Sequence, residues 1–263
     1  MSDALAPAPD LFALIREHTP ARVIVGRTGT AYRTATQLAL RGDHAAARDA
    51  VWATVDPARD LGADLFAVSS RAATRQEHLL RPDLGRQFDD DSRRRIGACP
   101  RNVDLQVFIG DGLSASAVRV QVPRLLPLLL DQAQRRGWSL GPVFFVRHAR
   151  VGLLNEVGEL IDPCVAVLLI GERPGLATAE SLSAYMAYRP RPGDTDAKRN
   201  LISNIHDRGL PPAEAAPRIL ALAEQMRRAG ASGVAIKEEL PAPALPIRRD
   251  RAGEDRGQLI ADN

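Results

Sequence analysis

The residues best suited to chemistry lie in two glycine-flanked strings, each placed directly after an apolar run. One string is Gly110-Asp111-Gly112 and the other is Gly171-Glu172-Arg173-Pro174-Gly175. Glycine lets a backbone approach a ligand closely, and a carboxylate accepts several hydrogen bonds. Glu172 could therefore bind a ligand, or it could pair with Arg173 or the start of a helix. The sequence favours neither interpretation of Glu172 over the other.

A second candidate is Ser114, in the string Gly112-Leu113-Ser114-Ala115-Ser116 between an expected strand and an expected helix. A hydrolase places its nucleophilic serine in this context, although the second glycine of that motif is missing. His148 or His206 would have to act as the base, and no acid is marked. We favour the alternative that Ser114 caps its helix by accepting a backbone N–H bond.

Two weaker motifs remain. Gly26-Arg27-Thr28-Gly29 follows an apolar run as a phosphate-binding turn would, but it lacks a third glycine and a lysine, so an ordinary turn is favoured. His206, in Asn204-Ile205-His206-Asp207-Arg208-Gly209, has the spacing to glycine of a histidine that ligates cobalt in some cobalamin proteins. Asn204 stands where that segment needs an aspartate, so a hydrogen-bonded or surface histidine is favoured.

Composition excludes several classes of function. The formal net charge is +3 over 263 residues and 4% of the residues are aromatic, which argues against nucleic-acid binding. The longest apolar run, 165–170, is too short to cross a membrane. Cys99 and Cys164 are the only cysteines and have no metal-ligand spacing, so neither a disulfide framework nor a metal site is expected. A cytoplasmic protein is the default.

The elements that must position these residues follow from hydrophobic periodicity. The first third has helical spacing, including residues 60–80, whereas short apolar runs alternate with helical stretches after Pro100. Strands are predicted at 103–110, 143–146, 165–171 and 233–236, and helices at 114–136, 180–187 and 212–230. The predicted fold is α/β: a mainly helical N-terminal region followed by a Rossmann-like, mostly parallel sheet, which would bind ligands at the carboxyl ends of its strands.

We therefore divide the chain into three parts. Residues 1–98 form a leader and helical region, and residues 99–240 form the α/β domain that carries the candidate site. Residues 241–263 follow a proline-rich stretch and lack periodicity, so we expect them to be disordered.

Several strings, in order along residues 19–237, resemble the light chain (small subunit) of ethanolamine ammonia-lyase. They are Thr19-Pro20-Ala21-Arg22 with Gly26-Arg27, Arg81-Pro82-Asp83-Leu84-Gly85-Arg86, Asp111-Gly112-Leu113-Ser114-Ala115, Gly171-Glu172-Arg173-Pro174-Gly175-Leu176, Ser181-Leu182-Ser183-Ala184-Tyr185, Ile202-Ser203-Asn204-Ile205 and Ala231-Ser232-Gly233. The order of so many strings is more specific than any single motif.

The resemblance implies a carbon–nitrogen lyase that uses adenosylcobalamin and a radical mechanism to convert ethanolamine into acetaldehyde and ammonia. Ethanolamine and the catalytic side chains belong to a large (heavy) subunit in a hetero-oligomer, so no catalytic residue is expected in this chain. The light chain completes one side of the cobalamin pocket.

The light-chain cobalamin contacts of the family fall on Val151, Glu172 and Leu201. Glu172 would accept hydrogen bonds from corrin amides, and Val151 suits an apolar or backbone contact. Leu201 replaces the cysteine usual in close relatives, so its contact depends on backbone or shape. Residues 38–43 also depart from the family pattern, which places subunit contacts in that segment in question.

Localisation and function each keep an alternative. Longer leaders in relatives direct enclosure in bacterial microcompartments, and the short proline-rich leader of this chain leaves that destination as the alternative to the cytoplasm. The alternatives to the lyase subunit are a stand-alone serine hydrolase that uses Ser114 and a non-catalytic cobalamin-binding assembly protein.

Overall fold

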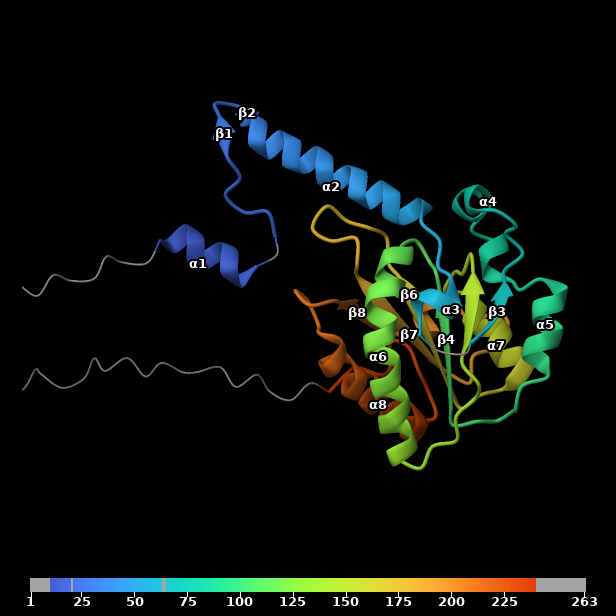
Figure 1. The fold of residues 1–263 in the computed structure, drawn as a ribbon. Coiled ribbons are helices and arrows are strands. Elements are labelled where there is room, and N and C mark those ends of the chain that lie inside the picture. Colours follow the sequence, from blue (N-terminus) through green and yellow to red (C-terminus); the bar gives the residue numbers. More distant parts are fainter. Residues whose placement is uncertain (1–9, 20, 63–64, 240–263) are drawn as a thin grey trace, which may run out of the picture.

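A six-stranded mixed sheet with helices on both faces forms the body of the molecule (Figure 1). The computed structural model describes residues 10–19, 21–62 and 65–239. The strand order is β3-β5-β4-β6-β7-β8, with the first four parallel and the last two antiparallel. The predicted α/β fold with a mostly parallel sheet is confirmed. The strands are β3 (Phe66–Ser69), β4 (Leu105–Gly110), β5 (Phe144–Arg147), β6 (Val165–Gly171), β7 (Leu182–Tyr188) and β8 (Asn200–Ile205).

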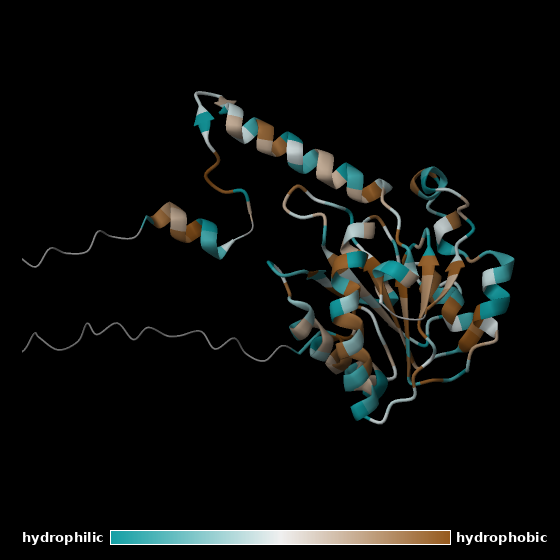
Figure 2. Cartoon of the chain, in the orientation of Figure 1, coloured by the Kyte–Doolittle hydropathy of each residue, from teal (hydrophilic) through white to brown (hydrophobic). Residues whose placement is uncertain are grey.

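The central strands are apolar because both of their faces are covered. Every residue of β4 and β6 is buried, as expected for parallel strands between two layers of helices. One face packs against α6 (Ala115–Arg135) and α8 (Pro212–Ala229), and the other packs against α5 (Asp90–Gly97) and α7 (Leu153–Ile161). Figure 2 shows the predominantly hydrophobic strands between helices that carry both hydrophilic and hydrophobic residues.

The N-terminal elements extend away from this body (Figure 1). They are α1 (Leu11–His18), the hairpin of β1 (Arg27–Thr28) and β2 (Ala31–Tyr32), and α2 (Thr34–Trp52). The favoured interpretation of the turn at residues 26–29 is confirmed, because this segment forms the hairpin and Gly29 takes the positive φ of +62° that its turn needs. The described part of the chain also contains four short elements: α3 (Pro57–Asp60), α4 (Arg75–Leu80), η1 (Leu84–Arg86) and η2 (Asp196–Lys198).

Three sequence predictions about local structure are wrong. Residues 182–188 form β7 instead of a helix, and residues 66–69 of the supposedly helical 60–80 stretch form β3. Residues 233–236 make a turn after α8 and belong to no strand. In the first two cases pairing with a neighbouring strand of the sheet overrides local helix propensity.

The division of the chain into 1–98 and 99–240 stays a prediction. The strand β3 belongs to the first of these parts and forms an edge of the main sheet. The expected disordered tail, 241–263, lies outside the described residues. Among the helices in the described ranges, none combines the length and apolar character needed to span a bilayer.

The glycines of two helices give a test of this packing. A Cβ atom on Gly158, in α7, would overlap the carbonyl oxygen of Pro190, whereas nothing lies within 4 Å of a Cβ on Gly42, in α2. We expect Gly158→Ala to lower the free energy of unfolding, measured by urea denaturation, by about 1–3 kcal/mol.

Gly42→Ala is the matched control, since alanine at an open helical position stabilises by up to about 1 kcal/mol. Equal effects of the two substitutions would contradict the packing of α7 against Pro190.

Candidate functional site

The candidate site lies at the carboxyl ends of the parallel strands, where β4 and β5 are neighbours but lead to opposite faces of the sheet. The helix α6 follows β4 on one face, and α7 follows β5 on the other. Loops that leave a sheet in opposite directions open a crevice between them, which is the usual ligand position in such folds. Both predicted rim strings, at residues 110–112 and 171–175, lie at this end of the sheet.

The buried carboxylate of Asp111 joins the two loops. Its Oδ2 accepts the backbone N–H of His148 at 3.0 Å, and its Oδ1 accepts that of Ala149 at 2.9 Å. The guanidinium of Arg75 lies 3.5 Å away and also donates to the carbonyl of Gly112 at 2.8 Å. Burial raises the pKa of Asp111 and lowers that of Arg75, and the ion pair opposes both shifts. The backbone path that leads to Arg150 and Val151 is thereby fixed.

A neutral histidine lies under this loop. His78 is fully buried, and burial, assisted by the charges of Arg150 and Arg75, lowers its pKa to about 3. Its Nε2 is 3.2 Å from the carbonyl oxygen of Gly112, so this nitrogen carries the proton and donates. The carbonyl of His78 accepts a hydrogen bond from Arg150 Nη2 at 2.8 Å. His78 therefore supports Arg150 and is uncharged at neutral pH.

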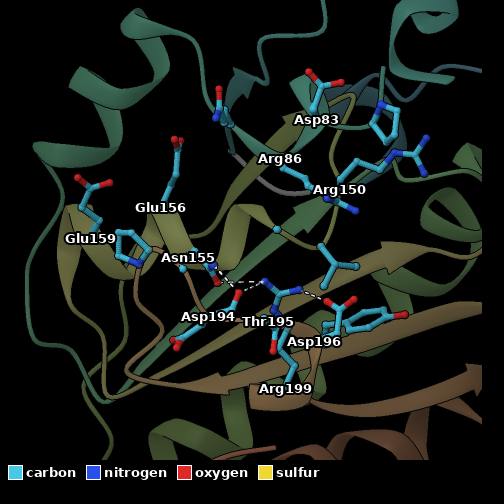
Figure 3. Close-up of a pocket in the computed structure, with 17 residues that line it drawn as sticks. Asp83, Arg86, Arg150, Asn155, Glu156, Glu159, Asp194, Thr195, Asp196 and Arg199 are labelled. Carbon is cyan, nitrogen blue, oxygen red and sulfur yellow. Dashed lines mark hydrogen bonds and ion pairs between the residues drawn. The ribbon is translucent and has the colours of Figure 1, made fainter. Parts of the chain in front are cut away.

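Two hollows meet at this loop. The larger hollow has a volume of about 780 Å³ and the smaller one about 380 Å³, and Arg150, Val151 and Tyr185 line both. Glu172 and Arg173 line the smaller hollow. Figure 3 shows the larger hollow, with Arg86 and Arg150 along one side and the segment Asp194–Asp196 with Arg199 along the other. Val151 and Glu172, two of the three predicted contacts, thus share the smaller hollow.

Glu172 is held in place by its own chain. Its Oε2 accepts the hydroxyl of Ser181 at 2.9 Å, and its Oε1 accepts the hydroxyl of Ser183 and, at 3.4 Å, the backbone N–H of Asn204. Glu172 forms no ion pair with Arg173 among the described residues; its local partners are instead these two hydroxyl groups and one backbone N–H. Since a carboxylate offers about four acceptor positions, Glu172 keeps some capacity for a ligand. Burial, then the charge of Glu172, raises the pKa of the neighbouring Tyr185.

Leu201 lies on β8 directly opposite Tyr185 of β7. Paired residues project from the same face of a sheet, and Tyr185 packs on the α7 side. Leu201 therefore belongs to that face, where it is 45% exposed. Leu201 lines neither hollow. It lies next to both, because its partner in the β7–β8 pairing, Tyr185, lines both.

The remaining sequence candidates have structural roles. Ser114 is fully buried, its hydroxyl accepts the N–H of Ala117 at 3.1 Å and donates to the carbonyl of Ala179 at 2.5 Å. The predicted helix cap is confirmed, and no histidine contacts the serine, so the hydrolase arrangement is wrong. His206 is buried with Nε2 2.7 Å from Asn204 Oδ1, and Nδ1 accepts the N–H of Arg208 at 3.2 Å, as expected for a hydrogen-bonded histidine.

Sequence reasoning missed Tyr185 and the support provided by Arg75 and His78. The sequence predicts a helix at Tyr185, because Leu, Ala and Met in residues 182–188 also suit a helix and only pairing with β6 makes the segment a strand. Nothing in the sequence marks Arg75 or His78, because their role depends on α4 packing beneath the loop after β4. Within the described ranges, no group of three or more His, Cys, Asp or Glu side chains is placed to hold a metal ion.

Comparison with known proteins shows the family of this chain. The family model described as ethanolamine ammonia-lyase light chain (EutC) matches residues 9–237. An ethanolamine ammonia-lyase small subunit of Fusobacterium nucleatum is 43% identical over 227 residues, covering 86% of this chain and 77% of the relative. Small subunits of Pseudomonas fluorescens (43% identical; 88% and 87% covered) and Pseudomonas syringae pv. tomato (40%; 100% and 95%) are similarly close. The chain belongs to the ethanolamine ammonia-lyase light chain family.

Proposed function

We propose that this chain is the small subunit of an adenosylcobalamin-dependent ethanolamine ammonia-lyase and forms one wall of the cobalamin pocket. The observation that carries the proposal is the convergence of Val151 and Glu172 on one hollow at the carboxyl edge of the sheet. Leu201 stands beside that hollow, across the β7–β8 pairing from Tyr185. A large subunit covers the open side of the hollow and supplies the catalytic side chains.

The chemical character of the hollow fits a corrinoid. A corrin ring has an apolar surface edged by amide groups, which need both acceptors and donors. Glu172 offers a carboxylate fixed by two serine hydroxyls, and Val151, Leu113 and Tyr185 offer apolar surface. Arg173 lines the same hollow and offers N–H donors.

The role of this chain is to bind, orient and shield. When bound, adenosylcobalamin supplies the radical chemistry that converts ethanolamine into acetaldehyde and ammonia. The residues of the small subunit hold the corrin edge in one position, because Glu172 and the loop at Asp111 are fixed by hydrogen bonds before any ligand arrives. Closure of the hollow between two subunits keeps water away from reactive species.

The large subunit also explains the exposed apolar side chains of the N-terminal elements. The helix α1 has no buried residue and exposes Leu11, Phe12 and Leu14, while α2 exposes Leu38 and Trp52. Exposed apolar groups gathered on such elements are typical of a surface that a partner covers. We propose the cytoplasm as the location, with enclosure in a bacterial microcompartment as the alternative, and neither a nucleic acid nor a membrane as partner.

Reconstitution tests this proposal. Acetaldehyde formation from ethanolamine and adenosylcobalamin should require this chain and a matching large subunit together, because each supplies part of the site. Activity of the large subunit alone at the full rate would contradict the proposal. A complex that binds cobalamin without turnover would favour the non-catalytic assembly protein.

Glu172→Gln tests the carboxylate. We expect the dissociation constant of adenosylcobalamin from the two-chain complex to rise about tenfold, because hydrogen bonds to a charged acceptor contribute about 1.5–3 kcal/mol. Absorbance titration measures this constant. The matched control is Glu224→Gln on α8, where the side chain pairs with Arg228 on the other layer of the molecule, and equal losses in both variants would refute the role of Glu172.

Leu201 tests whether shape makes the third contact. Leu201→Cys should keep the cofactor dissociation constant within about twofold, because both side chains are apolar and half-exposed positions tolerate a small loss of area. Leu201→Arg should weaken binding by at least tenfold (about 1.4 kcal/mol), since a bulky cation would face the corrin edge. Unchanged binding by both variants in the same titration would place Leu201 outside the pocket.

A further inference from the structure

Three arginines at the two hollows have no carboxylate partner among the described residues. Arg86 lines the larger hollow, Arg173 lines the smaller one, and Arg150 lines both. The fourth arginine of these hollows, Arg199, forms an ion pair with Asp196 and donates to Asn155 Oδ1 at 3.0 Å. The positive charge of the first three is therefore not neutralised within the described chain.

The acidic residues of the larger hollow do not supply the missing charge. Glu156 and Glu159 both pair with Arg93, at 2.9 and 3.4 Å, and Glu156 also accepts the N–H of Phe88. The others are engaged as well: Asp83 pairs with Arg81, Asp196 with Arg199, and Asp194 accepts the N–H of Arg191. Each carboxylate of this hollow thus accepts hydrogen bonds from donors other than Arg86 and Arg150, which are labelled in Figure 3 and form no ion pair among the described residues.

Arg150 is built into the structure in a way that a solvent-exposed arginine is not. Its Nη2 donates to the carbonyl of His78, its side chain packs against Gly85, and its Nε is buried without a partner. Burial lowers the pKa of Arg150, and the charges of Arg75, Arg86 and Arg173 lower it further, against the single opposing charge of Asp111. A cation in such surroundings is stabilised by an added anion.

The shape of the donor set indicates the class of anion. Guanidinium groups present paired N–H donors that match the oxygens of phosphate groups, and the charges of Arg86 and Arg173, which both act on Arg150, favour a phosphate over a neutral ligand. Gly152, directly before α7, lines the larger hollow as well, so the positive end of that helix adds to the field.

We propose that Arg150, with Arg86 on one side and Arg173 on the other, forms a binding subsite for a phosphate ester anion. This inference rests on the proposed function, because the cofactor named there carries one such group, the phosphodiester of its nucleotide loop. Free phosphate has the same chemistry and is the other possible source. The subsite would fix the nucleotide end of the cofactor while Glu172 and Val151 fix the corrin edge.

Three corrinoids test the subsite in the two-chain complex: cobalamin, cobinamide phosphate, which keeps a phosphate but lacks the base, and cobinamide, which lacks both. Arg150→Gln should raise the dissociation constants of the first two about tenfold and leave that of cobinamide unchanged, because a charge-assisted hydrogen bond is lost only where a phosphate is present. Arg150→Lys should restore part of the loss. Arg147→Gln, at the exposed end of β5 and outside both hollows, is the matched control.

Arg86→Gln provides a second variant that keeps the side chain of Arg150, and it should show a smaller loss with the same dependence on phosphate. Equal losses for all three corrinoids, or no loss for any, would overturn the subsite while leaving cobalamin binding intact. Inorganic phosphate, titrated into the wild-type and Arg150→Gln complexes and followed by ³¹P NMR, separates the sources. If free phosphate binds but cobinamide phosphate binds no more tightly than cobinamide, the subsite belongs to free phosphate. If no corrinoid binds, the proposed function fails, and the phosphate titration still tests the arginines.

Discussion

The carboxylate of Asp111 is the contact on which the rest of the site depends. By accepting the backbone N–H groups of His148 and Ala149, it joins the loop after β5 to the end of β4. At this point the chain continues to opposite faces of the sheet, to α6 after β4 and to α7 after β5. Arg150 and Val151 follow immediately, so their positions are set by this buried carboxylate. Leaving a buried ion without such partners would cost several kcal/mol, which is why Arg75 and the two N–H groups accompany it.

The antiparallel strands extend the same edge into a surface. The helices α6 and α8 cover one face of β7 and β8, whereas on the other face Tyr185 is half-buried and Leu201 is exposed. The hydroxyl groups of Ser181 and Ser183, from the start of β7, hold Glu172 at the rim of this face. The parallel strands thus supply the loops of the site, and the antiparallel strands supply an exposed face beside them. This arrangement suits a ligand that is shared with a second subunit.

The parts of this arrangement that could be predicted are those encoded by local pattern. The fully apolar runs of β4 and β6 and the cap at Ser114 follow from single segments of sequence. The strand β7 could not be predicted in the same way, because Leu, Ala and Met in residues 182–188 also suit a helix and only pairing with β6 decides between them. The juxtaposition of Tyr185 with Leu201, and of His78 with Gly112, arises from contacts between distant segments, which no local pattern specifies. Glu172 was identifiable because the string around it resembles the family.

We propose that this chain supplies one wall of a cobalamin site shared with a large subunit. The most direct measurement is a structure of the two-chain complex with cobalamin bound. We expect the corrin edge to lie against Val151 with a side-chain amide within hydrogen-bond distance of the Glu172 carboxylate, and Tyr185 to contact the same ligand. A corrinoid enclosed entirely by the large subunit, with the hollow at Glu172 filled by solvent, would contradict the account.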